Sequence, residues 1–131
     1  MPIQTDGLSH VALRVTDLAR SKQFYAETLG FPIVQEFADV VLVNANGVLL
    51  GMRGGNPATA PGDRFDPYRV GVDHLALAVA DPAALAGLQR QLDAAGVPNN
   101  GVEDDPTTGG RYISFSDPDG IAWELYHLPA A

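Results

Sequence analysis

Three residues of this sequence have the side chains needed to form a metal centre: His10, His74 and Glu124. Two neutral imidazoles and one carboxylate, with coordination positions left open, form the facial arrangement that suits non-haem Fe(II) and related divalent ions. Such a set leaves the ion net positive, so the ion could bind and polarise an anionic oxygen ligand. Each residue alone has a simpler interpretation, since a single histidine in a strand is usually structural and a glutamate in a terminal strand usually faces solvent.

The two histidines occupy the same position of an internal repeat. Residues 7–17 align with residues 71–81 at an offset of 64 positions, with Gly, His, Ala, Leu, Val and Asp matched. Each copy alternates like a strand, with apolar residues on one face and the histidine on the other, where small and polar residues follow it. Glu124 lies between Trp123 and Leu125 and therefore points away from the apolar face of its own strand. A pseudo-twofold arrangement of the two copies would place the histidines at equivalent positions.

Further elements repeat after these strands. Asp17 and Asp81 stand where a helix N-cap belongs, and helical apolar spacing follows over residues 18–29 and 82–95. Each helix ends at a glycine, as is typical of a C-cap. Strand-like runs come next; they cover residues 31–37, 40–45 and 48–52 in the first half, and a weak run near Val102 followed by 111–116 and 121–128 in the second half.

The sequence therefore predicts an α+β fold of two tandem βαβββ modules, at about residues 7–52 and 71–128. We expect them to form one domain over residues 1–131, with a curved eight-stranded mixed sheet. Between them, residues 53–70 are rich in Gly, Pro and Asp and show no periodicity. A loop of this length in a compact domain is usually functional, so a lid or an interface segment is expected there.

Composition excludes several kinds of partner. The chain has 131 residues, of which 46% are hydrophobic, and 16 acidic residues against 8 basic ones give a net charge of -8. This acidic balance, without a basic cluster, argues against nucleic acid and against an anionic membrane surface. The absence of cysteine excludes disulfides and thiolate metal sites. No signal-peptide pattern and no apolar run of membrane-spanning length are present, so a cytoplasmic location is expected.

The chain resembles the vicinal oxygen chelate superfamily, which includes glyoxalase I, bleomycin-resistance proteins, fosfomycin-resistance transferases and extradiol dioxygenases. The resemblance is carried by the repeated βαβββ halves, by Asp17-Leu18 followed by Leu29-Gly30-Phe31, and by residues 117–120 (Asp-Pro-Asp-Gly) followed by Trp123-Glu124-Leu125. It implies glyoxalase-like half-barrels, a homodimer and a small-molecule substrate. Carried over by position, it also implies that His10, His74 and Glu124 bind a divalent metal ion, with Fe²⁺ or Mn²⁺ preferred and Zn²⁺ or Ni²⁺ as alternatives.

Departures from the family patterns rank the reactions that the resemblance implies. Glyoxalase I uses a fourth, carboxylate ligand from the last strand of the first half, which has no acid here. Fosfomycin transferases have a tyrosine where this chain has Ser114. Extradiol dioxygenases share the His, His, Glu set, but their acid-base histidine has no counterpart, since His127 lies on the opposite strand face. Dioxygenase-like chemistry therefore ranks above lyase or isomerase chemistry, and the alternative is a drug- or metabolite-sequestering protein of the bleomycin-resistance type.

Other residues near this set have two interpretations each. Arg14 shares the face of His10 and could pair with an anionic substrate, or it could be an edge residue whose guanidinium reaches solvent. Tyr112 could donate a hydrogen bond in the pocket as a catalytic residue, or it could pack at the rim, and Tyr126 carries the same ambiguity. Asp73 could orient His74 or could simply be a surface residue.

Overall fold

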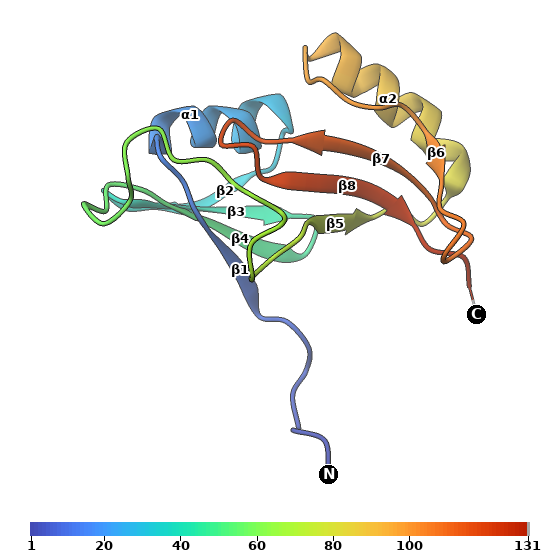
Figure 1. The fold of residues 1–131 in the computed structure, drawn as a ribbon, viewed down its shortest axis with the longest axis horizontal. Helices are drawn as coiled ribbons and strands as arrows, with labels where there is room; N and C mark the ends of the chain where they lie inside the picture. Colours follow the sequence, from blue (N-terminus) through green and yellow to red (C-terminus); the bar gives the residue numbers. More distant parts are fainter. Residues whose placement is uncertain (131) are drawn as a thin grey trace. The chain divides into compact units, whose positions relative to one another are not determined.

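The computed structural model describes residues 1–130, and their contacts divide the chain into two compact units, Met1–Asp63 and Arg64–Ala131. Figure 1 draws the first unit from blue to green and the second from green to red. Each unit contains one four-stranded sheet and one main helix, in the order strand, helix, strand, strand, strand. The two units are described separately below.

The first unit forms a mixed sheet in the strand order β1-β4-β3-β2. The first strand β1 is parallel to the last strand β4, and the other pairs are antiparallel. The parallel pair is joined by a long crossover that contains the helix and two further strands, because parallel strands cannot be joined by a short turn. The elements are β1 (His10–Arg14), α1 (Leu18–Lys22) continued by a π-helical segment (Gln23–Thr28), β2 (Ile33–Glu36), β3 (Val40–Ala45) and β4 (Val48–Arg53).

Local sequence explains the boundaries of these elements. The side chain of Asp17 accepts a hydrogen bond from the backbone N–H of Arg20 and thereby caps α1. Asn46 and Gly47 both have positive φ, 53° and 100°, as a two-residue hairpin turn between β3 and β4 requires. α1 packs against β3 and β4, and the apolar faces of the strands form a core with Tyr25; its buried members include Leu13, Val15, Val43, Leu50 and Met52.

The second unit repeats this plan with the strand order β5-β8-β7-β6, in which β5 is parallel to β8. A 3-10 turn capped by the side chain of Asp81 leads into α2, which packs against β7 over a core that contains Ile113, Phe115 and Trp123. The elements are β5 (Leu75–Ala78), the turn (Pro82–Ala84), α2 (Leu85–Ala94), β6 (Glu103–Asp104), β7 (Arg111–Ser116) and β8 (Ala122–His127).

The predicted α+β class and the tandem βαβββ modules are confirmed. The eight strands are divided between two four-stranded sheets, one in each unit. The strand expected over residues 31–37 is shorter, Ile33–Glu36, because it begins beyond Pro32 and its pairing with β3 is irregular after Ile33. The segment 54–74 contains neither helix nor strand. Among the described residues, no helix is long and apolar enough to span a membrane.

Ser21 on α1 offers a test of this packing. Its side chain is fully buried, and its hydroxyl has no hydrogen-bond partner in the described structure. An unsatisfied buried hydroxyl costs stability, so we expect Ser21→Ala to raise the free energy of unfolding by about 1 kcal/mol. Urea unfolding of the two proteins would measure the difference. A loss of stability of similar size would show that the hydroxyl is satisfied in solution.

Candidate functional site

His74 and Glu124 meet on the open face of the second sheet. His74 lies directly before β5, and Glu124 pairs in register with Ala76 on the neighbouring strand β8. His74 Nε2 is 3.2 Å from Glu124 Oε1, and His74 Nδ1 is 2.6 Å from Asp73 Oδ1. The imidazole therefore lies between two carboxylates. The Asp73 side chain is exposed, so this residue is both a surface residue and a partner of His74.

The surroundings shift the pKa values of both groups. The hydrogen bond that the His74 ring donates to Asp73 raises the pKa of His74, with a further contribution from the charge of Glu124, against an opposing effect of burial. Burial raises the pKa of Glu124, and this effect exceeds the lowering effect of His74. Only 17% of the Glu124 side chain is exposed. Each group therefore keeps its proton to a higher pH than the isolated side chain would.

Tyr112 lies on the same face, but its hydroxyl already has a partner. The phenol donates a hydrogen bond to Glu103, and this bond, with burial and nearby negative charge, raises the pKa of Tyr112. Tyr112 pairs in register with Tyr126, and their rings stack with centroids 5.7 Å apart. The phenol is therefore held neutral with its proton directed to Glu103.

Tyr126 is fixed in a similar way by the loop before β7. Its hydroxyl donates to Asp105 Oδ2 at 2.7 Å and also contacts the hydroxyl of Thr108. The contact with Thr108 acts to lower the pKa of Tyr126, but the Asp105 carboxylate and burial outweigh it, so the net pKa is raised. A Cβ on Gly110 would lie 2.7 Å from this hydroxyl, so glycine is needed for the ring to occupy its place. The two tyrosines form a rigid aromatic surface beside Glu124.

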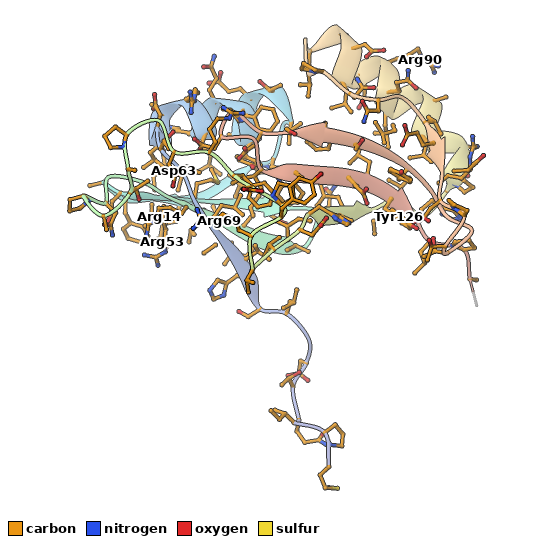
Figure 2. All side chains as sticks on the ribbon, viewed as in Figure 1. Arg14, Arg53, Asp63, Arg69, Arg90 and Tyr126 are labelled. Carbon is orange, nitrogen blue, oxygen red and sulfur yellow. The ribbon has the colours of Figure 1, made fainter. Side chains whose placement is uncertain are left out.

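His10 starts the equivalent strand of the first unit. Its side chain is exposed, and its Nδ1 lies 2.9 Å from the hydroxyl of Ser9, the residue that corresponds to Asp73 in the repeat. Arg14 lies further along β1 and pairs in register with Arg53 of β4, to whose carbonyl oxygen its guanidinium donates a hydrogen bond. Figure 2 labels both arginines, and within residues 1–130 neither has an acidic side chain within ion-pair distance. Two adjacent cations on one face repel each other unless an anion lies between them.

The register also identifies the counterpart of Glu124 in the first unit. Ala76 faces Glu124 across the pair β5–β8, and the equivalent Ala12 faces Gly51 across the pair β1–β4. The position that carries a carboxylate in one unit therefore carries no side chain in the other. A Cβ at Gly51 would lie 3.1 Å from Leu42 Cδ2, so the space beside this position is taken by Leu42.

The pair His74–Glu124 has the chemistry of a partial metal site. When Nδ1–H of neutral His74 donates a hydrogen bond to Asp73, Nε2 carries the lone pair and lies beside a carboxylate oxygen. This is the usual arrangement of a histidine ligand oriented by an acid. Nitrogen and oxygen donors of this kind suit divalent transition metals. No group of three metal-ligating side chains forms within residues 1–130. The structure thus joins two of the three predicted ligands, and the participation of His10 stays a prediction.

Several residues of these two open faces were missed by sequence reasoning. Glu103 and Asp105 hold the two tyrosines, and Arg53 faces Arg14. The alternation of each strand gives the face of a residue, but only the pairing register shows which residue lies beside it. A hairpin of known register could have placed Tyr112 opposite Tyr126, whereas the parallel pairing of β1 with β4 left no local signal for Arg53.

Comparisons with known proteins agree with this architecture. The Glyoxalase/Bleomycin resistance protein/Dioxygenase superfamily matches residues 7–125 of the chain. The uncharacterized protein YaeR of Escherichia coli (strain K12) is 34% identical over 124 residues, which cover 89% of this chain and 92% of that protein. The uncharacterized protein YwkD of Bacillus subtilis (strain 168) is 29% identical over 128 residues, covering 92% and 95%.

A solved structure from the same superfamily has a similar fold. The glyoxylase/bleomycin resistance protein/dioxygenase domain from Frankia sp. EAN1pec has a TM-score of 0.80 and 27% sequence identity, and the match covers 96% of this chain and all of that chain. The match extends over both βαβββ units.

The contact between Asp73 and His74 generates a pH prediction for the metal-free protein. Asp73→Asn removes the main cause of the raised pKa, so the pKa of His74 should fall, as measured by NMR titration of its ring protons. A histidine whose pKa is raised on folding stabilises the fold below its unfolded pKa, and this contribution is lost as the pH rises through the folded value. The variant should therefore lose stability at acid pH but not at alkaline pH. Asp6→Asn, at an exposed position, is the control, and equal pKa values in both variants would contradict the assignment.

Proposed function

Because this chain belongs to the Glyoxalase/Bleomycin resistance protein/Dioxygenase superfamily, we propose that it is a divalent-metal-dependent enzyme. Its small substrate would chelate the ion through two vicinal oxygens. The observation that carries this proposal is the convergence of His74 Nε2 and Glu124 Oε1 at 3.2 Å, with Asp73 holding the other imidazole nitrogen. Neither carboxylate has a Lys or Arg partner in the ion pairs of the described structure, so a metal cation is a chemically suitable counter-charge.

His10, His74 and Glu124 would hold the ion in this proposal. When bound, a divalent ion acts as a Lewis acid that draws electron density from the oxygens of its ligand. Asp73 orients His74, so it keeps the Nε2 lone pair directed to the site. We keep Fe²⁺ or Mn²⁺ as the preferred ions because two imidazoles and one carboxylate match the donor set typical of them, with Zn²⁺ or Ni²⁺ as alternatives.

The remaining polar residues have distinct roles in the proposal. Arg14, next to Arg53 in register, supplies positive charge for an anionic group of the substrate. Tyr112 would be a catalytic residue that lines the site as a neutral phenol. Its raised pKa excludes a role as a tyrosinate base near neutral pH. Its stacked partner Tyr126 extends the aromatic surface on which a planar substrate could lie.

The glycine at position 51 supports ranking dioxygenase-like chemistry above lyase or isomerase chemistry. With no side chain at the counterpart of Glu124, the proposed ligand set stays at three and leaves several coordination positions for a chelating substrate and a second small ligand. This arrangement favours dioxygenase-like chemistry over lyase or isomerase chemistry. The protein would act as a homodimer on a small molecule in the cytoplasm, and its mass in solution would test the dimer.

An alternative function is sequestration of a drug or metabolite, as in bleomycin-resistance proteins. The open face of the second sheet carries Glu103, Asp105 and Glu124 next to the two stacked tyrosines, which suits a cationic aromatic ligand. A metal requirement distinguishes the two functions, because a sequestering protein would bind its ligand without the ion.

Metal content tests the proposed centre. We expect close to one divalent ion per chain in the wild type, measured by elemental analysis after anaerobic loading, and almost none in His10→Ala or His74→Ala. Glu124→Gln should weaken binding by at least tenfold because it removes the only charged ligand. The control is His127→Gln, since His127 Nδ1 contacts the carbonyl oxygen of Val79 on the other side of the sheet. Equal occupancy in wild type and His74→Ala would favour sequestration instead.

The arginine pair tests substrate charge. Arg14→Ala should weaken binding of an anionic substrate by roughly 10- to 100-fold, as expected from the loss of a charge-assisted hydrogen bond, and should leave metal content unchanged. Arg53→Ala should have a smaller effect in the same direction. Arg90→Ala on the exposed face of α2 is the matched control (Figure 2). Affinities would be measured by calorimetry, with a neutral substrate for comparison. An unchanged affinity in the Arg14 variant would show that this guanidinium does not bind the substrate and is only a residue of the sheet edge.

A further inference from the structure

A cavity of about 420 Å³ opens at the edge of the second sheet, beside the end of β7. Ser114, Phe115 and Ser116 of β7 form one wall, and Asn99 and Asn100 form the other. These walls are tied together, because Asn99 forms a β-bridge with Phe115 and the side-chain amide of Asn100 donates to Ser114 Oγ at 2.9 Å. These contacts hold the two walls of the cavity in place within the second unit.

The cavity adjoins the His74–Glu124 pair. Ser114 pairs in register with Glu124, so both side chains project from the same face of neighbouring strands. Adjacent strands are about 4.8 Å apart. Glu124, Ser114 and Asn100 therefore form a row that leads from the proposed metal ligand to the sheet edge. A substrate held at Glu124 could extend a side arm along this row.

Apart from the carboxylate of Asp117, the polar side chains of the walls are neutral hydrogen-bonding groups. Within residues 1–130, Asn100 Oδ1 and the hydroxyl hydrogen of Ser114 have no partner, and the Ser116 side chain is exposed. Asn99 is already committed, since its amide donates to Asp93 and its oxygen accepts from Gly101. The carboxylate of Asp117, the charged residue of the lining, is buried and accepts backbone N–H groups of Asp119 and Ile121. An anionic arm would find no counter-charge in this lining, and the Asp117 carboxylate is already held by backbone N–H groups. A neutral polar arm would find both donors and acceptors.

We propose that this cavity is the subsite that selects substrates carrying a neutral arm with hydroxyl or amide groups. The inference rests on the proposed function, because it takes the chelating end of the substrate to lie at His74 and Glu124. Ser114 and Asn100 are the residues that determine this specificity: the serine hydroxyl donates to the arm, and the asparagine oxygen accepts from it.

Two matched probes test the subsite, 4-(2-hydroxyethyl)catechol and 4-ethylcatechol. Both have vicinal oxygens for chelation and arms of similar length, and they differ by the hydroxyl of the arm. Each probe is titrated into metal-free and metal-loaded protein. Binding is monitored by NMR through the signals of the Asn100 side-chain amide and the backbone amides of residues 114–116. The metal-loaded sample contains Zn²⁺, because a diamagnetic ion keeps these signals visible. Binding constants come from calorimetry on the same samples.

We expect the metal-loaded protein to bind the hydroxyethyl probe at least fivefold more tightly than the ethyl probe, with shifts centred on Asn100 and residues 114–116. Ser114→Val and Asn100→Ala should reduce this ratio to about one and leave the affinity for unsubstituted catechol unchanged. Thr107→Val and Asn56→Ala, at exposed positions outside the cavity, are the matched controls and should keep the ratio.

Equal affinity for the two probes, shifts confined to other residues, or no binding of either probe to the loaded protein would overturn the subsite. A failure of the proposed function gives a different result. In that case the added metal would not change the affinity for catechol. The ratio of the affinities for the two probes would still show whether the cavity binds the hydroxyl of the arm.

Discussion

The parallel pairing of the first and last strands within each unit is the constraint on which the rest of the structure depends. In the second unit it brings β8 against β5, so that Glu124 lies opposite Ala76, two residues after His74. These residues are far apart in sequence, and their contact forms only when the helix and two further strands have folded between them. Long-range parallel pairing of this kind carries a large entropic cost that the buried apolar faces must offset.

The two faces of each sheet divide stability from chemistry. Leu50, Ile113 and Trp123 point to the helix side and are buried, while His10, His74 and Arg14 lie on the opposite faces and are exposed. Because alternate residues of a strand point to opposite faces, substitutions on the open face can change the site without opening a cavity in the core. This separation allows one fold to carry different ligand sets.

The two units are similar in backbone but have diverged in charge. The second open face has Glu124, Glu103 and Asp105 near two stacked tyrosines, whereas the equivalent first face has Gly51 opposite Ala12 and the arginine pair at its end. One face is suited to a cation and the other to an anionic group. The repeat therefore gives two open faces of opposite charge from one structural plan.

The sequence by itself determined the repeat, the βαβββ order and the face of each strand, because caps, turns and the alternation of apolar residues are local signals. Asp17, Asp81 and the pair Asn46-Gly47 act as that local chemistry predicts. Only the tertiary structure decided which side chains lie together: His74 with Glu124, Tyr112 with Glu103, and Ser114 between Glu124 and Asn100. These contacts depend on strand register and on hydrogen bonds across the sheet, which arise from packing of the whole unit and leave no periodic pattern in the chain.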